Sequence, residues 1–295
     1  MRAAGFMLAS TLSFGAMAIV IRLASASLHT FEIAFFRNLF GLMAVLPLLL
    51  RMDPSALRTR QLPKYFIRCA IGIGSMLCGF WAIGHLPLAQ AISLSYSTPV
   101  FVTIAAALFL GEHVRARRWA AVGIGFIGVL VIVRPGSAEF STGTLIALAA
   151  AVLSGVVAIQ IKQLSRVDPA NTIVLYTYLF WVPMSLVPAL FVWEWPQGIA
   201  WVWVVAAGIF GTAGQVLWTH ALKLGEVSAL TPISFMQLPL VATAGWLWFG
   251  ESVDAWTWTG AGIILSANAY IAHREAVLLR RNATQAPSEA AKPGE

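Results

Sequence analysis

The residues that could do chemistry in this sequence are polar and aromatic side chains set within long apolar segments. Three of them are glutamines, Gln160, Gln215 and Gln237, whose amides both donate and accept hydrogen bonds and are costly to bury without partners. Each of these amides needs a hydrogen-bond partner, which could be a bound solute. Further substrate contacts are predicted for hydroxyl and aromatic residues of similar segments, which are Ser93, Tyr96, Ser97, Trp81, Trp218 and Phe235. The alternative roles are hydrogen bonding between helices for the hydroxyls and packing for the rings.

Sequence motifs of catalysis are absent. The chain has no Gly-x-Ser-x-Gly elbow, no His-Glu-x-x-His and no phosphate-binding Gly-Lys-Ser/Thr loop. Gly123, Gly125 and Gly128 match a dinucleotide-binding fingerprint, but they lie inside an apolar run without the preceding strand that such a site needs, so we predict that they pack helices together. We therefore expect no enzyme activity, no cofactor and no metal ion. A lipid-modifying membrane enzyme and a non-transporting receptor subunit are the distant alternatives.

The composition is that of an integral membrane protein. Hydrophobic residues make up 59% of the 295 residues and charged residues only 11%. The net charge of +7 would suggest nucleic-acid binding in a soluble protein, but the basic residues lie almost wholly in short loops between apolar runs. We expect the partners to be the lipid bilayer and a small-molecule substrate, with no nucleic acid. The sequence leaves the oligomeric state open.

Ten apolar segments are each close to the ~20 residues that an α-helix needs to cross a bilayer. Their approximate limits are 3–25, 31–50, 66–84, 88–110, 117–134, 142–161, 171–192, 199–221, 228–249 and 256–273. The loops that follow the even-numbered segments carry most of the lysines and arginines, among them Arg58, Arg60 and Arg117, whereas the opposite loops hold little beyond Arg134. This asymmetry places both termini in the cytoplasm. We expect the membrane to be of the bacterial inner-membrane type. The polar tail, 276–295, is expected to be disordered.

The chain also repeats itself. A shift of 140 residues places the segment around Arg22 on the segment around Lys162, and a shift of 139 places Gly111-Glu112 on Gly250-Glu251. The halves are 1–137 and 138–275. Because each half has five helices, the second enters the membrane from the opposite side. The predicted fold class is an all-α membrane protein with ten transmembrane helices as two inverted five-helix repeats around a central cavity, a build common among secondary transporters.

Several of these residues resemble a known family. The pattern Leu28-His29-x-Phe31-Glu32-x-Ala34-Phe35-Phe36-Arg37, a proline in the fourth helix and the Gly-Glu pairs that close the fourth and ninth helices are similar to the ten-helix EamA branch of the drug/metabolite transporter superfamily. The resemblance implies alternating access to a cavity lined by helices one, three, four, six, eight and nine. Because Gln160, Gln215 and Gln237 come from three of these helices, we expect them to bind the substrate. Members of the family include exporters of amino acids and importers of S-adenosylmethionine and of riboflavin.

One departure from that pattern bears on the substrate. Members that resemble S-adenosylmethionine importers carry a charged Tyr-Arg-Tyr-x-Glu arrangement in the ninth helix, where this chain has the neutral residues Ile233 to Gln237. A charged solute would lack its counter-charge there. We expect uptake of a neutral flat heterocycle such as riboflavin. The alternative is a transporter of S-adenosylmethionine, amino acids or drugs, in either direction.

Charged residues near the helix ends have several readings. Arg37 lies about two turns inside the second helix, so it needs a partner, which could be Glu32, a backbone carbonyl or another helix. Glu112 and Glu251 precede the fifth and tenth helices and are predicted to cap them. No carboxylate lies at mid-membrane depth, so we expect transport without obligatory proton symport.

The charge asymmetry gives the first testable prediction. Reporter fusions placed after Arg60 and Arg117 should give a cytoplasmic signal, and fusions after Gly136 and Gln197 an external one. A cytoplasmic signal at Gly136 would contradict the inverted repeat.

Overall fold

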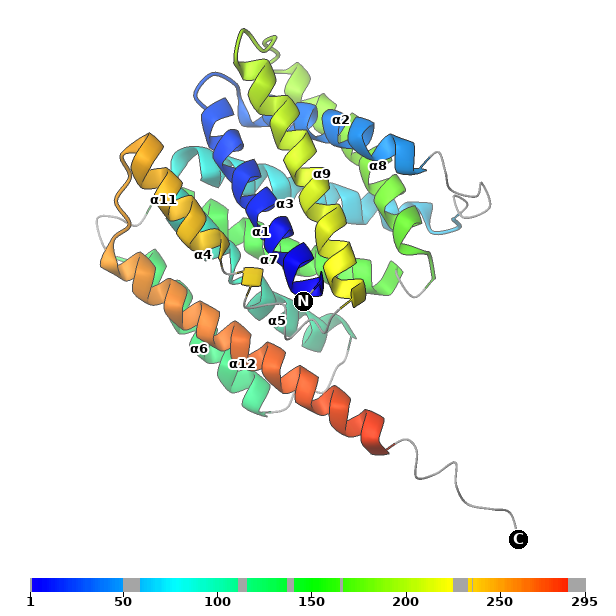
Figure 1. Ribbon diagram of the computed structural model, residues 1–295, viewed down its shortest axis with the longest axis vertical. Helices are drawn as coiled ribbons and strands as arrows, with labels where there is room; N and C mark the ends of the chain where they lie inside the picture. Colours follow the sequence, from blue (N-terminus) through cyan, green and yellow to red (C-terminus); the bar gives the residue numbers. More distant parts are fainter. Residues whose placement is uncertain are drawn as a thin grey trace.

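The computed structural model is helical, with no strand in the part of the chain that it describes (Figure 1). The described residues are 2–49, 59–110, 116–136, 141–164, 167–224, 233–234 and 236–285. The helices are α1 (Arg2–Ala24), α2 (Thr30–Leu49), α3 (Leu62–His85), α4 (Leu88–Ser95), α5 (Thr98–Leu110), α6 (Ala116–Val133), α7 (Thr142–Leu164), α8 (Ala170–Leu190), α9 (Ala200–Leu224), α11 (Gln237–Phe249) and α12 (Ala255–Gln285).

Seven segments of the described chain are long and apolar enough to cross a membrane. They are α1, α2, α3, the α4–α5 segment, α7, α8 and α9. The protein is therefore a multi-pass membrane protein. Helices α6, α11 and α12 stand at the other three predicted positions, and their crossing of the membrane stays a prediction. The boundary of the halves between residues 137 and 138 and the opposite orientation of the halves also stay predictions.

Two predicted segments differ from the structure. The segment 88–110, predicted as one helix, is divided into α4 and α5 at Tyr96 and Ser97. Pro99 is the cause, because it has no N–H to continue the helical hydrogen bonds and its ring crowds the preceding turn. At the other end of the chain α12 continues to Gln285, so residues 276–285 are helical where a disordered tail was predicted. This stretch is rich in alanine, leucine and arginine, which favour helix, and has no proline.

Contacts between the halves are reciprocal. Helix α1 packs on α9 and α3 on α7; α2 packs on α9 and α3 on α8; α5 packs on α7 and α1 on α11. The pairs α2–α8 and α6–α12 join equivalent helices of the two halves, and Figure 1 shows α6 and α12 side by side at one edge of the bundle. This exchange of partners is what two repeats related by an approximate twofold axis would produce.

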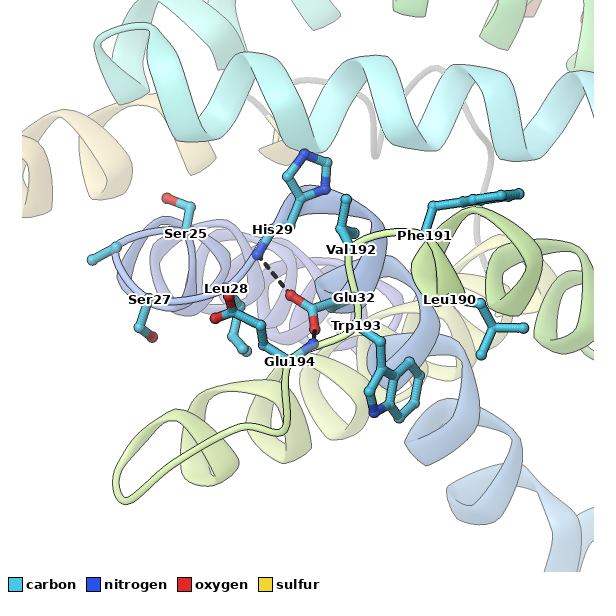
Figure 2. A pocket seen from close by; sticks show the side chains of 11 residues that line it. Ser25, Ser27, Leu28, His29, Glu32, Leu190, Phe191, Val192, Trp193 and Glu194 are labelled. Atoms are coloured by element: carbon cyan, nitrogen blue, oxygen red, sulfur yellow. Dashed lines mark hydrogen bonds between the residues drawn. The ribbon is translucent and has the colours of Figure 1, made fainter.

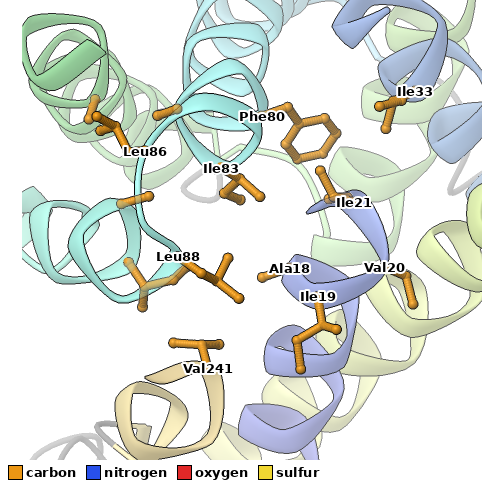
Figure 3. Packing of buried hydrophobic residues seen from close by; sticks show 14 of the residues in the cluster. Ala18, Ile19, Val20, Ile21, Ile33, Phe80, Ile83, Leu86, Leu88 and Val241 are labelled. Atoms are coloured by element: carbon orange, nitrogen blue, oxygen red, sulfur yellow. The ribbon is translucent and has the colours of Figure 1, made fainter. Parts of the chain in front are cut away.

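The main apolar core extends over most of the bundle, and Figure 3 shows the part of it where α1, α3, α4 and α11 meet. Ile21, Leu88 and Val241, one from each of α1, α4 and α11, are fully buried there. Phe80 and Ile83 of α3 join the same cluster. The core therefore holds the short helices α4 and α11 of the two halves against α1.

Glycines bring α6 and α12 into close contact. A Cβ atom at Gly260 would lie 2.6 Å from the carbonyl oxygen of Gly128 and 2.4 Å from Ile132 Cγ1. A Cβ at Gly125 would lie 2.6 Å from Val100 Cγ2 on α5. The packing interpretation is thus confirmed for Gly125 and Gly128. It is wrong for Gly123, because no atom of the described residues lies within 4 Å of a Cβ at that position.

The α6–α12 contact gives a second prediction. Gly260→Leu should lower the free energy of unfolding by about 2 kcal/mol, because the added side chain would overlap the Gly128 backbone. Gly262→Leu is the matched control on the same helix and should leave stability unchanged, because no atom in the described part of the chain lies within 4 Å of the added Cβ. Thermal unfolding in detergent measures both. Equal destabilisation of the two variants would argue against the glycine contact.

Candidate substrate site

The interruption between α4 and α5 removes a backbone carbonyl from the helical hydrogen bonds. The N–H of Val100, which would bond to Tyr96 O in a regular α-helix, donates instead to Ser97 O at 3.0 Å. Tyr96 O accepts a hydrogen bond of 2.7 Å from Asn268 Nδ2 of α12. The break is thus stabilised by a side chain from another helix.

Tyr96 also joins the break to the other half of the chain. Its phenol O–H donates to the carbonyl oxygen of Ser234, at 3.1 Å, just ahead of the start of α11. Interrupted helices from two repeats commonly meet at the substrate site of a secondary transporter, because their backbone groups and side chains can face a cavity there. We therefore assign the candidate site to the surroundings of Tyr96.

Other predicted site residues lie close to this point. Gln237 is half-buried at the first turn of α11, and its Cγ lies 3.6 Å from the position of a Cβ at Gly15 of α1. Ser93 and Ser97 are fully buried on either side of Tyr96. Ser97 Oγ donates to Leu94 O at 2.6 Å, which gives it a structural role in the turn, whereas Ser93 Oγ has no hydrogen-bond partner within the described chain.

The remaining predicted site residues are more dispersed. Gln160 is half-buried on α7, and its Oε1 is buried without a partner among the described residues. Gln215 and Trp218 are exposed three residues apart on α9. Trp81 stacks on His85 with a ring separation of 4.0 Å at the end of α3. The length of α4 separates this stack from the break in the sequence. Phe235 lies outside the described residues. The substrate-binding role of all these residues stays a prediction.

Arg37 does not pair with Glu32. Its Nη1 donates to Asn38 Oδ1 at 2.9 Å, and its guanidinium lies 5.9 Å from the ring centroid of Trp181 on α8. The partner is therefore a neighbouring amide and an aromatic face. Glu32, which is 1% exposed, instead accepts backbone N–H bonds from His29 and from Glu194 and so ties the start of α2 to the α8–α9 connection (Figure 2).

Glu251 caps a helix other than the predicted one. Its Oε2 accepts the N–H of Leu88 at 2.7 Å at the start of α4, and its Oε1 lies 2.6 Å from Arg22 Nη2 of α1. Arg22 also donates to Ile83 O at 3.0 Å. The predicted cap of the tenth helix was wrong, because Asp254 Oδ1 accepts the N–H of Thr257 at the start of α12. Glu112 lies outside the described residues.

A cavity that the sequence did not predict lies beside the contact between Glu32 and the Glu194 N–H. It has a volume of about 690 Å³ and opens between the α1–α2 and α8–α9 connections (Figure 2). Polar and aromatic residues, including Ser25, His29, Trp193 and Glu194, line it. In the sequence, the pattern Phe31-Glu32 was the feature that drew attention to the residues at this end of the protein. The cavity lies at the end that the charge asymmetry predicts to be external.

Comparison with known proteins identifies the fold family. The model of the EamA-like transporter family matches residues 1–134 and again 141–272. The chain belongs to the EamA-like transporter family. A solved structure matches this EamA-like protein with a TM-score of 0.61 over 92% of this chain and 98% of that chain, at 22% sequence identity, which supports the fold alone.

Two relatives of this EamA-like protein carry functional names. It is 30% identical over 281 residues to the riboflavin transporter of Vibrio cholerae, with 94% of each chain covered. It is 32% identical over 264 residues to the pseudopaline exporter of Pseudomonas aeruginosa, covering 88% of this chain and 91% of the exporter. The protein is a membrane transporter of small molecules.

The Glu251 contacts give a third prediction. Glu251→Ala should destabilise the EamA-like fold by about 2 kcal/mol, because it leaves Arg22 and the Leu88 N–H without their common acceptor. Glu194→Ala, an exposed carboxylate at the same end, is the control, since only its backbone N–H contributes to the Glu32 bond. Unfolding in mixed micelles measures both. An unchanged stability of Glu251→Ala would show that these contacts are dispensable.

Proposed function

We propose that the protein takes up a flat, uncharged heterocycle, with riboflavin as the best candidate, across a bacterial inner membrane. The observation that carries this proposal is the neutral character of the meeting point of the two halves. The described side chains that make or flank the Tyr96 contacts, Ser93, Ser97, Asn268 and Gln237, are all uncharged.

Energetics favour a neutral solute at such a site. A charged solute that leaves water for a low-dielectric cavity loses several kcal/mol of solvation free energy unless an opposite charge meets it. A flat neutral heterocycle keeps its polar edge satisfied by amides and hydroxyls, and its face can stack on a tyrosine ring. The name of the Vibrio cholerae relative points to the same class of solute.

Uptake by alternating access requires the external end to open and close. Under the predicted topology, Arg22, Glu251 and the Leu88 N–H lie at that end and link α1, α11 and α4, the helices that meet around the site. In an inward-directed cycle these contacts separate when the external side opens. The ion pair is partly exposed, with side-chain exposures of 20% and 13%, so its separation is less costly than that of a fully buried pair.

Competition for uptake tests the substrate. In vesicles, unlabelled riboflavin should inhibit the transport of labelled riboflavin, while S-adenosylmethionine and aromatic amino acids should not. Gln237→Ala should raise KM about tenfold, the equivalent of one lost hydrogen bond. Gln163→Ala, an exposed glutamine at the end of α7, is the matched control and should leave KM unchanged. Inhibition by the charged solutes but not by riboflavin would refute the proposal.

Export is the second candidate direction, and the relationship to the pseudopaline exporter favours it. Right-side-out and everted vesicles separate the two directions. If the protein imports its substrate, uptake should be saturable in right-side-out vesicles. If it exports the substrate, saturable uptake should occur in everted vesicles only.

A further inference from the structure

We propose that Asn268 of α12 is a positioning residue for substrate binding, which acts by holding the interrupted helix of the first half in place. The proposal rests on the proposed function for its substrate, but its structural step does not. Helix α12 is the tenth predicted segment, and the family resemblance does not count that helix among those that line the cavity. We therefore infer that a residue outside the expected cavity wall affects the affinity for the substrate.

The first step is the backbone at the break. Because Val100 N–H donates to Ser97 O at 3.0 Å, it does not donate to Tyr96 O as it would in a regular α-helix. Asn268 Nδ2 replaces that donor at 2.7 Å. Asn268 is 3% exposed, so water does not compete for this bond. Removal of the Asn268 amide would take this donor away from the Tyr96 carbonyl in an apolar environment, and we expect the break to shift in response.

The second step is the position of the Tyr96 side chain. Its carbonyl is held by Asn268 and its phenol O–H by Ser234 O at 3.1 Å. The residue is thus fixed at both ends, once by α12 and once by the segment ahead of α11. Any displacement at Asn268 is transmitted to the ring that we expect to stack on the substrate.

The third step is the rigidity of the support. The residue next to Asn268, Ala267, lies 3.6 Å from the position of a Cβ at Gly125 of α6, and Val100 of α5 lies 2.6 Å from the same position. About two turns earlier on α12, Gly260 packs against the Gly128 backbone. Helices α5, α6 and α12 are therefore in close contact, which holds the Asn268 amide at a constant distance from the break.

The fourth step is the free-energy cost of burying the Asn268 side chain. Asn268 Oδ1 is buried and has no hydrogen-bond partner in the described part of the chain. A buried acceptor without a partner is unfavourable, so a residue chosen for stability alone would be apolar at this position. The bond from Nδ2 to Tyr96 is the one favourable polar contact that the described structure gives to this side chain.

Transport kinetics provide the first test. Asn268→Ala should raise KM for riboflavin about tenfold and leave kcat nearly unchanged, since it removes one hydrogen bond that positions the binding residue. Asn268→Asp, which keeps the shape but loses the donor, should behave in the same way, and Asn268→Gln should recover part of the affinity. Ser266→Ala is the matched control, because Ser266 is exposed on α12 and its hydroxyl donates to Gly262 O of the same helix.

A double-mutant cycle separates positioning from general damage. Tyr96→Phe removes the bond to Ser234, so its effect on KM should be smaller in an Asn268→Ala background than in the wild type. Additive effects of the two substitutions would overturn the role of Tyr96 as the intermediate. A matching loss with Ser266→Ala would overturn the role of Asn268.

Hydrogen exchange tests the structural step without any substrate. In the solubilised full chain, Asn268→Ala should speed exchange of the amides of Val100 and Phe101 about tenfold, while the amides of α2 and α8 exchange as before. Unchanged exchange at these amides would overturn the proposal even if KM changed. Faster exchange in a protein whose wild type transports no riboflavin would refute the proposed function and leave the positioning role intact. If Asn268→Ala fails to fold, Asn268→Ser provides the same measurement.

Discussion

Every backbone N–H and C=O inside a bilayer needs a hydrogen-bond partner within the protein, because the hydrocarbon core holds no water to supply one. This constraint favours α-helix in the described segments that are long and apolar enough to cross the membrane, and it makes any interruption of such a helix costly in free energy. The interruption at Tyr96 persists because Asn268 supplies the donor that the helix lacks, and because Ser234 accepts from the same residue. The candidate site is therefore the place where the two halves of the chain supply hydrogen-bond partners to each other.

The same constraint explains where the acidic residues lie. Glu32 accepts two backbone N–H groups at the start of α2 and on the α8–α9 connection, and Glu251 accepts the first N–H of α4 while it pairs with Arg22. Each carboxylate thus stabilises a helix end and links distant parts of the chain at one end of the bundle. Contacts of this kind can separate and re-form as units, which suits a transporter whose halves move relative to each other.

Much of this arrangement was predictable from local patterns in the sequence. Hydropathy located the helices, and the spaced Gly-Glu pairs and the shifted arginine and lysine indicated the repeat. The sequence also placed Tyr96 and Gln237 at the interrupted segments. What it could not give are partners set by tertiary packing. Asn268 is 172 residues from Tyr96, and Glu251 caps a helix that begins 163 residues earlier, so no local pattern marks either bond. The charge on Glu251 suggested a cap, but only the packing of α4 beside the end of α11 decides which helix receives it.

Counterflow in proteoliposomes tests the central claim, that the neutral meeting point of the two halves carries a neutral heterocycle across the membrane. Liposomes are preloaded with unlabelled riboflavin and diluted into labelled riboflavin, with the pH gradient collapsed. We expect the label to accumulate transiently inside, because exchange through one site needs no ion gradient. Counterflow driven by preloaded S-adenosylmethionine, with none driven by riboflavin, would contradict the neutral site and with it the proposed transport.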